Sequence, residues 1–418
     1  MTATASKVER RLRDELSALQ LAPDTAAYEV DGVRPSVAVS PTSAAEVSKV
    51  LATADAVGAA VVPWGGGAHM ALGMPPKRYD LALDLSRLGQ VIEYEPADLT
   101  VTVEAGLPLA GLQAILAQHS QWLPLDPPAP ASATVGGVLA ANASGPARIA
   151  FGTARDLVIG MTVALADGRV VKSGGRVVKN VAGYDMAKAH IGALGTLGVI
   201  LQVSFKVAPL PKAVQTLSVA SGDVAALARA AFAVRDAALP ATGIAVLQAA
   251  GASEARLLLR FAGNPAAVDR STAETLRLAR SAGLEAEQAP EAVWAEAGSI
   301  RGLETGAVLK VSHLPSHAAG VLSRLEETGA DVVAYPTAGI SYARFLALPE
   351  TSYELVRRLR KSIEAQGGAL VLESAPVEAK TAIDVWGSPR GDFELMRRLR
   401  QEMDPKSTLN PGRFLEGL

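Results

Sequence analysis

The stretch Pro63–Gly73, PWGGGAHMALG, contains three consecutive glycines directly after a short apolar run. Because glycine has no side chain, such a loop lets backbone N–H groups approach an anion, most often a phosphate or pyrophosphate. The same stretch is equally compatible with a flexible surface turn. The choice between these two interpretations depends on the rest of the chain.

The residues that precede the loop alternate between strand and helix patterns. Residues 37–40 and 59–63 are short apolar runs, and residues 43–57 carry apolar side chains at helical spacing before a C-capping Gly58. A further amphipathic helix is predicted over residues 5–20. The order strand, helix, strand and glycine loop predicts an α/β arrangement.

Two further glycine-bearing segments follow the loop. Ser132–Gly145 (SATVGGVLAANASG) comes after a proline-rich segment, and Gly192–Gly198 leads into a strand predicted over 199–207. Between them, Ala166–Gly168 is typical of a hairpin turn, and residues 181–191 predict a helix. Glycine loops that approach one ligand from different sides would hold a long cofactor by its pyrophosphate.

The pattern changes after Pro209–Pro211, where we place a domain boundary. From there to about residue 375, strands and helices alternate without glycine-rich loops, which predicts an antiparallel sheet with helices on one face. The predicted strands are 214–219, 243–249, 255–262, 306–313, 331–335, 340–347 and 368–373. The predicted helices are 222–238, 265–283, 316–328, 351–366 and, near the end of the chain, 393–403.

The chain has 418 residues, a formal net charge of −2 and no cysteine. Its length predicts two or more domains, and its charge argues against a dedicated nucleic-acid binder. Without cysteine the chain cannot form disulfides, cysteinyl flavin links or iron–sulfur clusters of its own. The first residues lack the layout of a signal peptide, and no long apolar window predicts a membrane-spanning helix. We therefore expect a cytoplasmic protein that reaches the inner membrane only peripherally, through partners.

Several familiar motifs are absent. No glycine is followed by lysine, which excludes a P-loop, and neither HExxH nor G-x-G-x-x-G occurs. His313 and His317 are four residues apart, but Pro315 between them argues against a helix that presents both to a metal. We predict no metal site.

Four segments together resemble one family. PWGGGAHMALG and TVGGVLAANASGPARIAFGTARD resemble the two flavin-binding segments of the FAD-binding domain of the vanillyl-alcohol oxidase/p-cresol methylhydroxylase (PCMH) type. GRVVKNVAGYDMAKAHIGALGTLGVI, from Gly175, and DPKSTLNPGRF are similar to the FAD-linked 2-hydroxyacid dehydrogenase branch.

The resemblance implies an α+β fold. After a lead-in over residues 1–34, residues 35–210 would form a PCMH-type FAD-binding domain of two α/β subdomains. Residues 211–385 would form a ferredoxin-like, antiparallel-sheet cap domain with helices on one face. Residues 386–418 would return to the FAD domain.

The resemblance also implies that the chain binds FAD. The first loop would contact the pyrophosphate, the second segment would line the opposite side, and the third run would hold the adenine. The last segment would lie near the isoalloxazine. The implied FAD-binding residues are Pro63, Trp64, Gly65, Gly66, Gly67, Ala68, His69, Thr134, Val135, Gly136, Gly137, Ala141, Gly145, Arg148, Gly198, Val199, Asn410 and Arg413.

Each implied role has a plainer alternative. The glycines could serve turns alone, and Arg148 and Arg155 could form surface ion pairs. We expect four polar residues to cap or anchor a helix rather than touch flavin: Lys179, Asn180, Tyr184 and Asp185. In family members with a histidyl flavin, the histidine directly follows the glycine pair, whereas here Ala68 has that place and His69 comes one residue later. We therefore expect FAD to be bound non-covalently.

No catalytic residue can be named. The cap lacks the histidine-rich metal motif with which single-chain members of the branch bind the hydroxyacid. Five residues could bind a carboxylate or a proton by type alone, and we expect each to be structural: His313, Lys310, Tyr342, Arg344 and Arg390.

The missing motif bears on the predicted function. Within the branch, the chain resembles the FAD-binding subunits of glycolate-oxidising complexes, which work beside a catalytic flavoprotein subunit and an iron–sulfur subunit. The alternatives are a stand-alone FAD oxidoreductase for another small 2-hydroxyacid or alcohol, and a structural subunit that has lost flavin.

Overall fold

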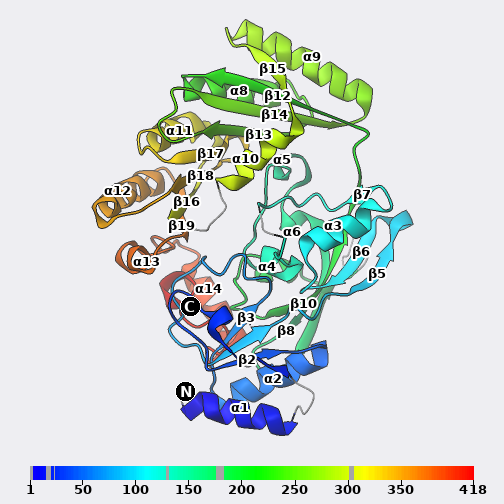
Figure 1. Ribbon diagram of the computed structural model, residues 1–418, viewed down its shortest axis with the longest axis vertical. Coiled ribbons are helices and arrows are strands. Elements are labelled where there is room, and N and C mark those ends of the chain that lie inside the picture. Colours follow the sequence, from blue (N-terminus) through cyan, green and yellow to red (C-terminus); the bar gives the residue numbers. More distant parts are fainter. Residues whose placement is uncertain (1–2, 16–19, 23, 129–130, 176–182, 301–305) are drawn as a thin grey trace.

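The computed structural model describes residues 3–15, 20–22, 24–128, 131–175, 183–300 and 306–418. Figure 1 shows an elongated molecule with a large sheet and its helices at one end and helices α1 (Ala3–Glu15) and α2 (Ala44–Val57) at the other. The predicted helix over 5–20 corresponds to α1, and residues 16–19 lie outside the described residues.

The first sheet carries the triple-glycine loop. Its strand order is β1-β2-β4-β3, in which β2, β4 and β3 are parallel and β1 is antiparallel to β2. The strands are β1 (Gln20–Leu21), β2 (Val37–Ser40), β3 (Val61–Trp64) and β4 (Leu81–Asp84). Helix α2 connects β2 to β3, and Ser43 caps its N-terminus. Gly58, with φ 72°, ends the helix as predicted.

The second sheet is antiparallel throughout, in the order β5-β6-β10-β8-β9. Its strands are β5 (Val91–Glu95), β6 (Thr100–Glu104), β8 (Val158–Ala164), β9 (Val170–Gly174) and β10 (Val199–Lys206). The segments between these strands contain α3 (Leu109–Ala117), β7 (Gln121–Trp122), α4 (Val135–Ala140), α5 (Arg148–Phe151), α6 (Ala154–Leu157) and α7 (Ala187–His190). β7 pairs with β11 (Ala208–Pro209), outside this sheet.

The prediction of one helix over residues 181–191 is wrong for its described part. Only Ala187–His190 is helical, as α7. Gly183 has φ 131° and Gly192 has φ 86°, so the backbone leaves the helical region on both sides. Residues 181–182 lie outside the described residues.

The cap is built on an eight-stranded antiparallel sheet in the order β15-β12-β14-β13-β17-β18-β16-β19. Its strands are β12 (Ala213–Ser221), β13 (Ala241–Gln248), β14 (Ala255–Gly263), β15 (Ala286–Ala289), β16 (Ala307–Ser312), β17 (Asp331–Tyr335), β18 (Ile340–Phe345) and β19 (Ala369–Ser374). Its main helices are α8 (Val224–Asp236), α9 (Pro265–Ser281), α11 (Ala318–Glu326) and α12 (Tyr353–Glu364). The predicted antiparallel sheet is confirmed, and β15 is a strand that the sequence pattern missed.

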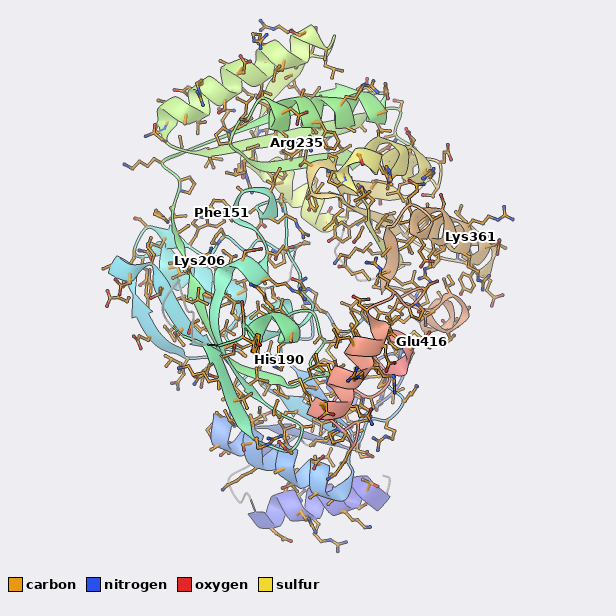
Figure 2. The ribbon with its side chains drawn as sticks, turned by 180° about the vertical axis from the view of Figure 1, so that it is seen from behind. Phe151, His190, Lys206, Arg235, Lys361 and Glu416 are labelled. Atoms are coloured by element: carbon orange, nitrogen blue, oxygen red, sulfur yellow. The ribbon has the colours of Figure 1, made fainter. Side chains whose placement is uncertain are left out.

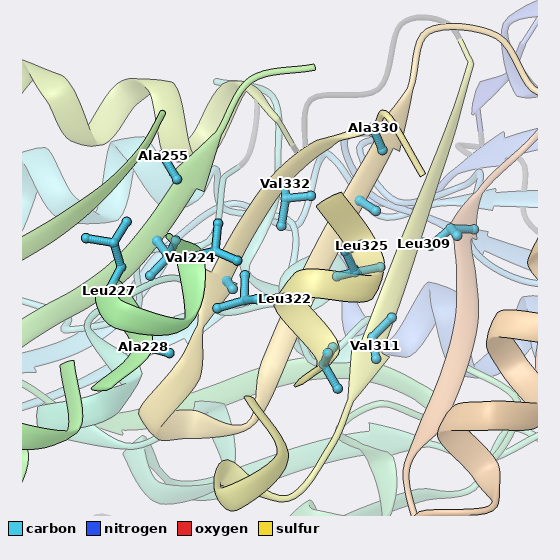
Figure 3. Packing of buried hydrophobic residues seen from close by; sticks show 14 of the residues in the cluster. Val224, Leu227, Ala228, Ala255, Leu309, Val311, Leu322, Leu325, Ala330 and Val332 are labelled. Atoms are coloured by element: carbon cyan, nitrogen blue, oxygen red, sulfur yellow. The ribbon is translucent and has the colours of Figure 1, made fainter. Parts of the chain in front are cut away.

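Alternating side chains give the cap sheet two apolar faces. Leu309, Val311 and Val332 pack against α8 and α11 on one face (Figure 3). The other face buries a smaller cluster that includes Val308 and Val333, and the short helix α10 (Trp294–Ser299) packs against it. The four main helices lie on one face as predicted, and α10 is an unpredicted addition on the other.

The C-terminal segment returns to the first sheet. It contains α13 (Val377–Ile383) and α14 (Phe393–Met403). The Asn410 amide donates to the Val61 carbonyl at 2.8 Å, next to a parallel bridge between Val61 and Leu409. Arg400 donates to the carbonyls of Thr196 and Leu409 and pairs with buried Asp404. These contacts place the C-terminal segment directly beside the glycine loop.

Candidate functional site

Two adjoining pockets lie where β3 ends and the triple-glycine loop begins. Both are lined by Pro63, Gly65, Thr134, Gly137, Ala140 and Leu194. The first pocket is also lined by Gly66, Gly67, Ala68, His69, Met70, Leu72, Ala141, Asn410 and Arg413. The second is also lined by Trp64, Leu85, Ala105, Gly136, Gly195, Gly198, Val199 and Ile200. The two pockets thus form one groove, lined by glycine main chain, apolar side chains and two polar residues of the C-terminal segment. This arrangement is typical of cofactor sites.

The glycines of the first loop are required by the close approach of the second segment. An ideal Cβ on Gly66 would lie 1.6 Å from the Ser132 carbonyl oxygen, and one on Gly65 would lie 2.1 Å from Thr134 Oγ1. Gly67 has φ 75°. Among the described residues, none accepts a hydrogen bond from the amides of Gly65, Gly66, Gly67 or Ala68. The loop therefore packs tightly and still has N–H groups for a ligand.

The second segment is helical at its centre, which the sequence pattern did not predict. Thr134 caps α4 by accepting a hydrogen bond from the Gly137 amide at 3.3 Å. The Gly136 amide donates to the Ala105 carbonyl at 2.7 Å, and a Cβ on Gly136 would lie 2.8 Å from Ala105 Cβ. Val135 is buried in the core instead of the groove.

Asn410 and Arg413 line the first pocket, and each has a buried side-chain atom without a partner among the described residues. Asn410 donates from Nδ2 to the Leu194 carbonyl at 2.5 Å, while its Oδ1 has no partner among the described residues. Arg413 donates from Nη2 to the carbonyls of Met70 at 2.7 Å and Leu72 at 2.5 Å, while its Nη1 has none. Burial lowers the pKa of Arg413, and nearby Asp31 and Tyr79 oppose that shift.

The hydrogen-bonding needs of Asn410 Oδ1 and Arg413 Nη1 can be compared with the groups that FAD offers. Buried polar atoms normally have hydrogen-bond partners, so Asn410 Oδ1 calls for a donor and Arg413 Nη1 for an acceptor. FAD offers both kinds of group, together with a pyrophosphate for the free loop amides. The residues present therefore fit FAD.

Gly198 and Val199, predicted at the adenine end, line the second pocket. A Cβ on Gly198 would lie 2.5 Å from Val163 Cγ1 and 3.2 Å from His190 Cε1. His190 is 4% exposed, and its Nδ1 has no partner among the described residues. Burial lowers the pKa of His190 to about 4, so the ring is neutral at pH 7.

His190 should make the folded chain sensitive to acid. Its pKa is below the unfolded value of 6.5, so the unfolded chain binds the extra proton first as the pH falls. Stability should therefore drop between pH 7 and pH 4.5, by about 2 kcal/mol from this residue alone. Urea unfolding of the wild type and His190→Leu at both pH values measures this. An equal loss of stability in the two proteins would contradict the prediction.

Gly145 and Arg148, two further predicted site residues, line neither pocket. A Cβ on Gly145 would lie 1.8 Å from the Asp126 carbonyl oxygen. The Asp126 carboxylate accepts from the Ala147 amide at 3.0 Å and lies 3.5 Å from Arg260 Nη2 on cap strand β14. Burial raises the pKa of Asp126 to about 6, and Arg260 opposes the shift. Residues 145–148 thus join the predicted FAD-binding domain to the cap. Phe151 of α5 lies at the same junction (Figure 2).

None of the five residues considered for catalysis, four in the cap and Arg390 in the C-terminal segment, lines the two pockets. Arg344 pairs with Asp331 at 2.7 Å. His313 lies within hydrogen-bond distance of Ser341 Oγ and the Leu314 carbonyl. Arg390 approaches the Gly368 carbonyl, and Lys310 faces Tyr342 across the β16–β18 pair. The catalytic residues stay unassigned.

The remaining arginine and helix-anchor predictions have mixed outcomes. Arg155 donates to the Ile191 carbonyl at 3.2 Å. Tyr184 is 90% exposed, and Asp185 pairs with Lys188 at 2.9 Å. Lys179 and Asn180 lie outside the described residues.

Sequence reasoning missed part of the site. The pocket residues Met70, Leu72, Ala140 and Leu194 lie within four positions of predicted site residues in the sequence, and that proximity is the signal that could have found them. Among the described residues, no helix is long and apolar enough to cross a bilayer. The same residues contain no group of three or more His, Asp or Glu side chains that could hold a metal ion.

Comparisons with known proteins agree with this geometry. Residues 35–174 match the model of a family described as an FAD binding domain. The chain is 31% identical to glycolate oxidase subunit GlcD of Bacillus subtilis over 183 residues, which are 44% of this chain and 39% of that protein. It is 40% identical to glycolate oxidase subunit GlcE of Escherichia coli over 124 residues, 29% of this chain and 35% of that protein. The matched part thus spans less than half of either relative.

The fold extends the similarity to nearly the whole chain. A crystal structure of p-cresol methylhydroxylase with substrate bound superposes with a TM-score of 0.75 at 16% identity, covering 98% of this chain and 96% of the other. This match confirms the predicted α+β fold class of the PCMH type. The family match covers residues 35–174 of the FAD-binding domain predicted over residues 35–210, and it supports FAD as the cofactor.

Proposed function

We propose that this chain is an FAD-binding subunit of a glycolate oxidase or dehydrogenase complex. In this proposal glycolate is oxidised to glyoxylate, and the electrons pass through FAD. The observation that carries the proposal is the groove at the end of β3, where free loop amides and the unpartnered atoms of Asn410 and Arg413 meet in a matched FAD-binding domain. The similarity to two glycolate oxidase subunits supports the substrate class.

The chain's own residues would bind and orient the cofactor. FAD supplies an acceptor for the two electrons that leave the alcohol carbon. The amides of Gly65, Gly66, Gly67 and Ala68 would hold the pyrophosphate, because they donate no hydrogen bond to a described residue. The polar side chains of Asn410 and Arg413 would fix the cofactor at the other side of the pocket.

Two observations favour partner subunits. No cap residue considered for catalysis lines the described pockets, so the cap supplies no base to a substrate hydroxyl there. The chain has no cysteine for an iron–sulfur cluster. We therefore propose a GlcD-like catalytic flavoprotein subunit and a GlcF-like iron–sulfur subunit as partners.

The purified chain should bind FAD and still fail to oxidise glycolate alone. After reconstitution with FAD, it should show flavin absorbance bands that do not bleach when glycolate is added without oxygen. Bleaching should appear once a GlcD-like subunit is added. Flavin bleaching by the chain alone would favour a stand-alone oxidoreductase, and absence of flavin bands would indicate a structural subunit.

We further propose that FAD is not covalently attached, because Ala68 has the place of the histidine that carries the link in other members. Acid precipitation should release the yellow colour into the supernatant. Colour that stays in the pellet would contradict this proposal and would point to His69, which lines the first pocket.

A further inference from the structure

Three consecutive carbonyl groups at the end of the triple-glycine loop accept hydrogen bonds from two buried cations. Arg413 donates to the carbonyls of Met70 and Leu72, at 2.7 and 2.5 Å. Lys380 donates to the carbonyl between them, that of Ala71, at 2.6 Å. Arg413 belongs to the C-terminal segment, and Lys380 lies on α13, which follows the last cap strand. Two distant parts of the chain thus hold one end of the loop.

Lys380 is an unusual residue to find in this place. Its side chain is fully buried, and all three of its donated hydrogen bonds are accounted for: one to Ala71 and one to each carboxylate oxygen of Asp31, at 2.7 and 2.8 Å. Burial and the nearby Arg413 charge lower the pKa of Lys380, and Asp31 opposes them. A buried lysine is costly, so its complete set of partners indicates a specific role.

The charges of this cluster favour an anion in the neighbouring pocket. With Lys380 and Arg413 each carrying one positive charge and Asp31 one negative charge, the cluster has a net charge of +1. Arg413 lines the first pocket directly. A net positive charge in a low-dielectric region attracts a pyrophosphate more strongly than it would in water.

The cluster also restricts the shape of the loop. Strand β3 holds the start of the loop in the first sheet, and the two cations hold the carbonyls of residues 70–72 at its end. The glycines between them, Gly65–Gly67, have few conformational limits of their own. Fixing both ends reduces the ordering that a ligand must otherwise impose, which raises affinity.

We propose that Lys380 is a positioning residue of the cofactor site, through which α13 holds the triple-glycine loop in its FAD-binding shape. The inference rests on the proposed binding of FAD. It makes FAD affinity depend on a residue that does not line the pocket and that reaches the loop from the end of the cap.

The test measures FAD binding by the full-length chain after its flavin has been removed, using flavin fluorescence. Lys380→Met should raise the FAD dissociation constant at least tenfold. Lys361→Met is the matched control, since Lys361 is an exposed lysine on α12 (Figure 2); it should change the constant less than twofold. Circular dichroism verifies that each variant is folded.

A double variant separates positioning from simple charge neutralisation. Lys380→Met leaves Asp31 buried without its cation, so the single variant should also lose thermal stability. Asp31→Asn/Lys380→Met removes both charges and should regain much of that stability. Its FAD affinity should stay at least tenfold weakened, because the Ala71 carbonyl still lacks its hydrogen-bond donor. If the single variant does not fold, the double variant decides.

Two results would overturn the role of Lys380, and a third would also overturn the proposed function. Wild-type FAD affinity in Lys380→Met, or full recovery of affinity in the double variant, would limit Lys380 to pairing with Asp31. A wild-type chain that binds no FAD would overturn the proposed function and this inference with it.

Discussion

Replacing Gly66 with alanine should lower FAD affinity more than tenfold and destabilise the folded chain by about 3 kcal/mol or more. The new methyl group would lie 1.6 Å from the Ser132 carbonyl oxygen, a backbone atom that cannot move aside as a flexible side chain would. The two glycine-bearing segments would have to separate. Because they form opposite sides of one groove, the cofactor pocket would open with them.

Gly320→Ala is the matched control for this change. Gly320 lies within α11, and a Cβ there would meet no atom within 4 Å. Alanine has the higher helix propensity, so this variant should gain about 0.5–1 kcal/mol and bind FAD normally. Urea unfolding and FAD titration measure both proteins. Unchanged affinity and stability in Gly66→Ala would mean that the segments do not approach as closely as described.

Replacing Arg413 with methionine should have the second-largest effect, with a loss of FAD affinity of at least tenfold and of about 3 kcal/mol in stability. The part-buried carbonyl of Met70 and the buried carbonyl of Leu72 would lose their donor, and each unsatisfied buried group costs about 1–3 kcal/mol. The pocket would also lose the positive charge and the free Nη1 group that suit an anionic ligand.

Two further variants make this prediction specific. Arg358→Met removes an arginine whose side chain is 78% exposed and whose partner is Glu354, so it should change stability by less than about 1 kcal/mol and leave FAD binding intact. Arg413→Lys keeps the charge but not the planar fork that reaches two carbonyls, so it should restore only part of the affinity. Full FAD affinity in Arg413→Lys would indicate that charge alone matters.

The sequence predicted those elements whose signals are local. The strand and helix periods around the triple-glycine loop, the Gly58 cap and the antiparallel pattern of the cap all agree with the structure. Local signals misled where glycines interrupt a helical composition, as around α7. Short elements such as α4, α10 and α13 had too few residues to produce a clear period.

The site was predictable only in part for a related reason. The glycines were found from the sequence, but the structural reason for Gly65 and Gly66 is their contact with residues 132–134, which no local pattern reveals. The pair of Lys380 and Asp31 joins residues 349 positions apart. Neither residue belongs to a motif, and a charged residue at either position would ordinarily be taken as solvent-exposed.

The return of the C-terminal segment to the first sheet has a consequence for biosynthesis. The groove is completed by Asn410 and Arg413, whereas its first wall, Gly65–Gly67, is made some 340 residues earlier, since the Arg413–Met70 bond spans 343 positions. A nascent chain can therefore form the first sheet and the cap while the cofactor pocket still lacks one side. Contacts of such long sequence separation form late and slowly. FAD should accordingly bind only after translation has passed Arg413. Added flavin should therefore stabilise a chain that contains Arg413 far more than a shorter nascent chain.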